Sequence, residues 1–205
     1  MLWSSSPIRG PNDDSLSNVH PSVHSPPRSC SGADAMSHPG SRVNWPVPAA
    51  PGSELRALER FHRDVTWTGR VRAAGSVPEM TAQGQGRFRS SADGLWIIGE
   101  FSQDQYFQGR KVTSWSAHYI AGWDVARRCY VAFAADSNAR SVPFTGAIDG
   151  DRFVITSDGA SIGGAPVRLR MIWDATEPEV MTWRNEMSIG DGPWGLIEEY
   201  QMRPL

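Results

Sequence analysis

From about residue 64 onward, hydrophobic and polar residues alternate in short runs, as they do in strands that are buried on one face. The runs are rich in Val, Ile, Trp, Tyr, Phe and Thr, and Gly, Asp, Asn or Pro separates them. We expect ten strands, at residues 64–73, 82–89, 94–102, 111–123, 128–136, 142–149, 152–157, 166–174, 179–188 and 194–203. The pattern therefore predicts a mainly β protein.

Short turns join these strands. Asp149-Gly150 is a two-residue hairpin signal between FTGAI and RFVIT, and Asp93-Gly94 and Asp191-Gly192 mark further turns. Short connections favour antiparallel neighbours, and only one short helix is expected, in residues 53–64, where Ser53 is a candidate N-cap. A parallel βαβ fold is thereby disfavoured. A meandering barrel or sandwich remains, and ten strands suit an antiparallel up-and-down β-barrel.

Residues 1–51 show no such periodicity. They hold nine of the fifteen prolines and eleven serines. Such a stretch cannot bury enough apolar surface to offset the entropy of ordering it. We expect residues 1–51 to be a disordered N-terminal extension and residues 52–205 to form the barrel domain.

Met36 begins the segment MSHPGSRVNWPVP and would be a natural start of the protein. If residues 1–35 are an upstream extension without a structural role, a chain that begins at Met36 is expected to keep the thermal midpoint of the full chain. A thermal melt that shows a fall of several degrees would contradict this.

Composition removes several classes of partner. The formal net charge is −2 and the isoelectric point is about 6.2, so no basic field attracts nucleic acid or anionic lipid. No apolar stretch approaches the roughly 20 residues that cross a bilayer. The N-terminus lacks the apolar run of a secretory signal. The two cysteines, Cys30 and Cys129, do not suggest a disulfide framework. We expect a soluble, cytoplasmic protein with neither nucleic-acid nor membrane partners.

The motifs TWTGRVRAAG, GLWIIGEF, HYIAGWD, FTGAIDGDRFVI and IEEYQMRP resemble, in order and spacing, a widespread bacterial family of unknown function. Members of that family look like lipocalin-like, calycin-type barrels, and the resemblance covers roughly residues 54–203. It implies architecture more than activity. TWTGRV is also similar to the opening of haem-binding nitrobindin-type barrels, with Gly69 as the shared glycine. Those barrels take an axial His from a late strand, and no His follows His118, so we expect no haem.

His118 is the strongest single candidate for chemistry. Alternation places it on one face with Ser114 and Ser116, where an imidazole could act as a general base or as a hydrogen-bonding group in a pocket. Glu100 shares a face with Trp96, and burial there would raise the pKa of its carboxyl. The alternative is that both residues point outward into solvent. If they point inward, His118 and Glu100 are the catalytic candidates.

Charged residues alternate along the late strands. Arg184 and Glu186 share one face, and Glu198 follows on the last strand. On the outside they would form cross-strand ion pairs worth roughly 0.2–1 kcal/mol. On the inside they would form a polar patch for a ligand's carboxylate, hydroxyl or amide. The candidate ligand-binding residues, which we expect to face one shared interior, are Trp96, Glu100, His118, Arg184, Glu186 and Glu198.

Other site types have weaker signals. His62-Arg63-Asp64 lies at a helix end, where a cap is a simpler explanation than a metal site. GQGRF and SIGGAP lack the helix that a phosphate-binding loop requires. Cys129 is interpreted as a small core residue rather than a nucleophile. We expect no metal and no cofactor.

Three functions therefore remain open. The first is binding of a small, partly apolar molecule inside the barrel. The second is an enzyme of bacterial small-molecule metabolism, of the isomerase or cyclase type, that uses the same cavity. The third is a homodimerisation module with a filled interior, in which a second copy covers an apolar outer face. An interior volume of roughly 300 Å³ or more, lined by aromatic and convergent charged groups, would favour the first two.

Overall fold

The computed structural model describes residues 52–162, 165–177 and 179–205, and the predictions made for residues 1–51 lie outside them. The described ranges contain one helix, α1 (Ser53–Glu59), and ten strands. The strands are β1 (Val65–Val71), β2 (Met80–Ser90), β3 (Trp96–Phe107), β4 (Arg110–Asp124), β5 (Cys129–Asp136), β6 (Ser141–Asp149), β7 (Arg152–Ile162), β8 (Ala165–Asp174), β9 (Met181–Ile189) and β10 (Gly195–Pro204). Each predicted strand corresponds to one observed strand, so the prediction of ten strands is confirmed.

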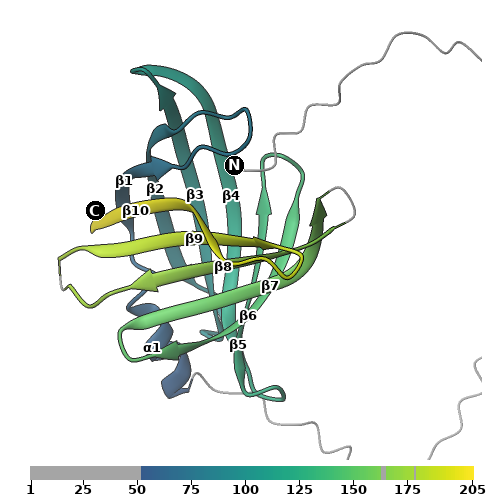
Figure 1. The fold of residues 1–205 in the computed structure, drawn as a ribbon. Helices are drawn as coiled ribbons and strands as arrows, with labels where there is room; N and C mark the ends of the chain where they lie inside the picture. Colours follow the sequence, from purple (N-terminus) through teal and green to yellow (C-terminus); the bar gives the residue numbers. More distant parts are fainter. Residues whose placement is uncertain (1–51, 163–164, 178) are drawn as a thin grey trace, which may run out of the picture. The chain divides into compact units, whose positions relative to one another are not determined.

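The ten strands form a closed barrel in which all neighbouring strands are antiparallel (Figure 1). Each strand pairs with the next one in the sequence, and β10 pairs with β1 to close the barrel. The predicted antiparallel up-and-down barrel is therefore confirmed. Gly69 of β1 lies opposite Tyr200 of β10 at the closure. A Cβ atom at Gly69 would lie 2.0 Å from the carbonyl oxygen of Glu199 and 2.6 Å from the Tyr200 ring. The closing strands approach this closely because residue 69 has no side chain.

Two strands extend five residues beyond their predicted ends. β3 continues past residue 102 through SQDQYF, whose polar composition resembles a loop. Gln103 and Gln105 are nevertheless buried, with exposed fractions of 5% and 0%. β7 continues past residue 157, and its pairing with β8 shifts register between Ser157 and Ala160. Such an irregularity lets a strand pass through an Asp-Gly step that otherwise indicates a turn.

The helix α1 lies at one end of the barrel, the lower end in Figure 1. Leu58 and Phe61 are fully buried there, and the Tyr130 hydroxyl donates a hydrogen bond to the Glu54 carbonyl oxygen at 2.9 Å.

The prediction of Ser53 as N-cap is wrong. Gly52 occupies that position without a side-chain hydrogen bond. The Ser53 hydroxyl donates instead to the Glu54 carboxylate. No helix in the described ranges is long and apolar enough to cross a membrane.

Aromatic rings fill the middle of the barrel. Trp173 and Trp183 lie directly opposite each other on β8 and β9, and their rings stack with centroids 5.9 Å apart. Trp67 meets the Trp183 ring edge-on at 5.7 Å, and Phe101 lies 5.6 Å from Trp183. Packing of this kind stabilises through the large area that each ring buries and through favourable ring geometry.

Candidate functional site

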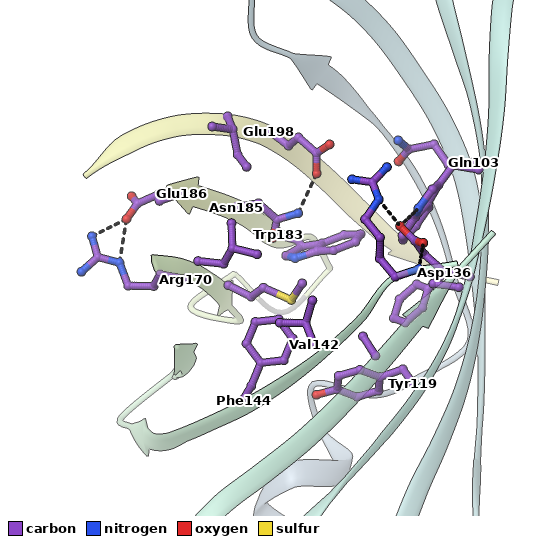
Figure 2. A pocket seen from close by; sticks show the side chains of 18 of the residues that line it. Gln103, Tyr119, Asp136, Val142, Phe144, Arg170, Trp183, Asn185, Glu186 and Glu198 are labelled. Atoms are coloured by element: carbon purple, nitrogen blue, oxygen red, sulfur yellow. Dashed lines mark hydrogen bonds and ion pairs between the residues drawn. The ribbon is translucent and has the colours of Figure 1, made fainter. Parts of the chain in front are cut away.

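A cavity of about 300 Å³ lies inside the barrel (Figure 2). Residues of β3, β4, β5, β6, β8, β9 and β10 line it, together with Arg140 of the turn between β5 and β6. Its aromatic lining is Phe101, Trp115, Tyr119, Phe144, Trp173 and Trp183, and its aliphatic lining is Ala117, Ala134, Val142, Leu169, Met171 and Ile197. The polar lining is Gln103, Asp136, Arg140, Ser141, Arg170, Asn185, Glu186 and Glu198. The wall is thus mostly apolar, with polar groups at a few places.

Asn185 and Glu198 form the buried polar part of the wall. They lie opposite each other on β9 and β10, and Asn185 Nδ2 donates a 2.7 Å hydrogen bond to Glu198 Oε2 (Figure 2). Both are buried, with exposed fractions of 8% and 7%. The pairing of β10 shifts register between Leu196 and Glu198. This irregularity allows two consecutive residues, Ile197 and Glu198, to line the cavity.

Tyr200 lies two residues after Glu198 and is also buried. Burial raises the pKa of the Tyr200 hydroxyl well above its ordinary value, and the charge of Glu198 raises it further. Tyr200 therefore remains neutral beside the Glu198 carboxylate. Gln103 of β3, which also lines the cavity, accepts a 2.9 Å hydrogen bond from Trp67 Nε1 through its Oε1 atom.

Asp136 is the last residue of β5, at the end of the strand that is farther from α1. Its side chain holds the turn that follows. Its carboxylate accepts hydrogen bonds from Trp115 Nε1 at 3.2 Å and from the backbone N–H groups of Asn138 and Arg140 at 2.9 and 3.1 Å. Burial alone would raise the pKa of Asp136, but these hydrogen bonds and the charge of Arg140 lower it overall. Asp136 is therefore an ionised, structurally engaged carboxylate.

Arg170 and Glu186 form a cross-strand ion pair at the edge of the cavity. They lie opposite each other on β8 and β9, and Arg170 Nε donates to Glu186 Oε2 at 2.7 Å. The Arg170 guanidinium also lies 4.3 Å from the centre of the Trp194 ring. Figure 2 shows the pair to one side, away from Gln103 and Asp136. This arrangement corresponds to the ion-pair interpretation of the alternating charges.

The prediction that His118 and Glu100 face the interior is wrong. Both side chains are exposed, and they lie opposite each other on the outer surface of β4 and β3. The interior positions beside them belong to Tyr119 and Phe101, which are 3% and 6% exposed. Large aromatic side chains gain more by burial than a carboxylate or an imidazole, and they decide which face of each strand points inward.

The other predicted ligand-binding residues divide into two groups. Glu198 and Glu186 border the cavity, whereas Trp96 and Arg184 are absent from its lining. Trp96 precedes the buried Ile97 on β3 and is half-buried on the opposite face. Arg184 alternates with the buried Trp183 and Asn185 and so points away from the interior. The six residues therefore do not share one interior.

Asn185 was not among the predicted site residues, because it lies between the charged Arg184 and Glu186. The alternation of inward and outward residues along β9 could have identified Asn185 as an inward residue. Asn185 shares its face with Met181 and Trp183, which are both 3% exposed. An amide on such a face is buried and needs hydrogen-bonding partners.

His62 is a buried residue between α1 and Tyr119, and Tyr119 lines the cavity. Its Nδ1 atom lies 3.0 Å from the Leu58 carbonyl oxygen, and its Nε2 atom lies 3.3 Å from the Tyr119 hydroxyl. Burial lowers the pKa of His62 to about 4, and the bond to Leu58 offsets only part of this effect. The imidazole is therefore neutral near pH 7, with Nδ1–H donating to the last turn of the helix. The interpretation of this segment as a helix cap agrees with this bond.

Among the described side chains, no three His, Cys, Asp or Glu residues are grouped as metal ligands would be. A comparison with curated proteins found no match to the chain. Residues 50–203, which include α1 and nearly all of the barrel, match the model of a family described as "Protein of unknown function (DUF1579)". The chain therefore belongs to the DUF1579 family.

Proposed function

We propose that the barrel binds a small, partly apolar molecule in its interior cavity. The observation that carries this proposal is the cavity of about 300 Å³, with a mostly apolar and aromatic wall and a few buried polar groups. This volume and this kind of lining are typical of small-molecule sites. The space would hold about ten waters at the volume that each occupies in the liquid.

The cavity wall also contains polar atoms that a ligand could satisfy. Trp173 Nε1, Trp183 Nε1 and Asn185 Oδ1 are buried and have no hydrogen-bond partner among the described residues. A buried polar group without a partner costs roughly 1–3 kcal/mol. A bound molecule with matching donors and acceptors would offset part of this cost, after small rotations of these side chains. The empty protein is expected to be less stable than the loaded one.

The two alternatives have less support. A dimerisation module with a filled interior does not agree with a cavity of this size. An enzyme that uses His118 and Glu100 inside the barrel does not agree with their exposed positions. Tyr119, which lines the cavity, and His62, which contacts the Tyr119 hydroxyl, are both held neutral, since burial lowers the pKa of His62 and raises that of Tyr119. Neither group is suited to gain or lose a proton near pH 7.

Native mass spectrometry of the protein purified from its own host tests the proposal. We expect a small-molecule adduct that disappears on denaturation. Ala134→Trp should remove the adduct, because Ala134 lines the cavity and an indole there would fill much of it. Ala135→Trp is the matched control, since Ala135 lies opposite the exposed His118 on the outer face. An adduct that is equal in both variants would place the ligand elsewhere, and its absence from every preparation would contradict binding.

A further inference from the structure

Resting on the proposed binding in the cavity, we infer that the ligand is an uncharged amphiphile. Its polar end would be a neutral group such as a hydroxyl, at the end of the cavity farther from α1, and its apolar body would lie against the rings nearer the helix. Two observations carry the inference. The polar and apolar parts of the wall lie at different places along the barrel, and each charged side chain of the described wall already has a partner.

The separation of polar and apolar groups follows the strands. Asp136 is the last residue of β5, Arg140 lies in the turn that follows, and Ser141 begins β6. Tyr119 lies nearer to α1, since its hydroxyl is 3.3 Å from Nε2 of His62, just after the helix. Figure 2 shows the rings of Tyr119 and Phe144 below the labelled charged residues. A molecule with one polar and one apolar end matches such a wall.

An ion pair occupies the charges at the polar end. Arg140 Nε lies 3.9 Å from Asp136 Oδ2. The Asp136 carboxylate also accepts hydrogen bonds from Trp115 Nε1 and from the backbone N–H groups of Asn138 and Arg140. The negative charge of Asp136 is therefore stabilised by the protein itself and needs no cation from a ligand.

A second ion pair occupies the charges at the side of the cavity. The Nε and Nη2 atoms of Arg170 both donate to Glu186 Oε2, and hydrogen bonds between two charged groups are stronger than those between neutral ones. The third carboxylate of the wall, Glu198, accepts the 2.7 Å hydrogen bond from Asn185 and has a further interaction besides. No charged side chain of the described wall is thus left for a ligand of opposite charge.

A charged ligand group would lose more than it gains in this cavity. Removal of an ionised group from water costs far more free energy than removal of a hydroxyl, unless an opposite charge meets it. The side chains of Asp136 and Glu186 are each only 17% exposed, so a ligand group beside them is largely shielded from water. A neutral group needs no counter-charge, and the amide of Gln103 and the hydroxyl of Ser141 line the cavity.

Three probes with the same ring and chain test the inference. They are 3-phenyl-1-propanol, 3-phenylpropanoate and 3-phenylpropylamine, which at pH 7 end in a hydroxyl, a carboxylate and an ammonium group. Calorimetric titration measures their affinities. We expect the alcohol to bind about tenfold or more tightly than either charged probe, because the described wall offers no unpaired counter-charge. Ala134→Trp should abolish binding of the alcohol, since Ala134 lines the cavity.

Variants that break one ion pair from either side should change the preference in opposite directions. Glu186→Gln removes the anion that Arg170 contacts and should strengthen binding of 3-phenylpropanoate about tenfold. Arg170→Gln leaves Glu186 without its cation and should strengthen binding of 3-phenylpropylamine to a similar degree. A thermal melt of each variant checks that it is folded.

Asp174→Asn is the matched control. It breaks the cross-strand ion pair of Arg152 and Asp174, on β7 and β8, and neither residue lines the cavity. This variant should leave the affinities for all three probes unchanged.

The outcomes separate the inference from the proposed function. If a charged probe binds the unaltered protein as tightly as the alcohol, and Ala134→Trp abolishes that binding, the inference is wrong and the proposed cavity binding stands. If Glu186→Gln and Asp174→Asn change the affinity for 3-phenylpropanoate equally, the ion pair does not set the preference and the inference is also wrong. If none of the three probes binds, the inference is wrong. The proposed function fails with it only if protein from its own host carries no adduct that Ala134→Trp removes.

Discussion

Trp67→Ala is expected to lower the free energy of unfolding by about 3–5 kcal/mol, the usual cost of removing a large buried side chain. Trp67 is 2% exposed and lies in the middle of the ring cluster, with ring centroids 5.7 Å from Trp183 and 6.0 Å from Phe101. The change also leaves Gln103 Oε1 without the indole donor that it contacts at 2.9 Å. Urea denaturation at pH 7 measures the loss.

Trp96→Ala is the matched control for this prediction. Trp96 is half-buried on the outer face of β3, where its ring packs over Gly122. Because Trp96 is less completely buried than Trp67, its truncation should cost less than that of Trp67. A loss below about 1 kcal/mol for Trp67→Ala, or an equal loss for both variants, would contradict the central position of Trp67 in the core.

The sequence predicted the strands well because two independent signals agree in this chain. Alternation located the strands, and glycine turns such as Asp149-Gly150, where Gly150 has a φ of 56°, located the connections. Where either alternation or a glycine turn is missing, the predicted strand boundaries are wrong. The end of β3 contains Gln103 and Gln105, whose amides are buried. The sequence alone does not distinguish a buried glutamine from a glutamine in a loop.

The orientation of the strands was harder to predict, since β3 and β4 carry apolar residues on both faces. Alternation shows that Glu100 and Phe101 point to opposite sides, but it does not show which side is inside. The size of the side chains decides it. Tyr119 and Phe101 fill the interior, and the small Ser116 beside the exposed His118 lies outside. Small residues on one face thus indicate solvent here, not room for a ligand.

Part of the cavity wall depends on a local irregularity that the sequence does not reveal. Glu198 faces inward by regular alternation with the buried Tyr200 and Met202, whereas Ile197 lines the cavity beside it where the pairing of β10 shifts. In a regular strand, one of these two consecutive residues would point outward. Glu198 was predicted as a site residue from its charge alone, and its partner Asn185 was missed. The candidate site therefore required the register of β9 and β10.

Acidification from pH 7 to pH 4 is expected to remove about 3 kcal/mol of stability through His62 alone, with about 2 kcal/mol already lost at pH 5. Burial lowers the pKa of His62 from 6.5 in the unfolded chain to about 4 in the folded protein. As the pH falls below 6.5, the unfolded chain therefore binds a proton that the folded protein excludes. The stabilisation is complete above pH 6.5 and is lost as the pH falls towards 4.

Urea denaturation between pH 7 and pH 4, on the unaltered protein and on His62→Gln, isolates this contribution. Phe88, Tyr119, Phe153 and Trp173 surround His62, and Tyr119 is the only titratable group among them. Burial raises the pKa of Tyr119 above its ordinary value, so it stays neutral throughout this range. The aspartates with lowered pKa values, such as Asp136, are the same in both proteins and cancel in the comparison.

His62→Gln should lose stability at pH 7 but show a clearly shallower decline towards pH 4. His118→Gln, on the exposed surface, should decline as steeply as the unaltered protein. Parallel curves for His62→Gln and His118→Gln would mean that His62 accepts a proton within the folded barrel as easily as it does in the unfolded chain.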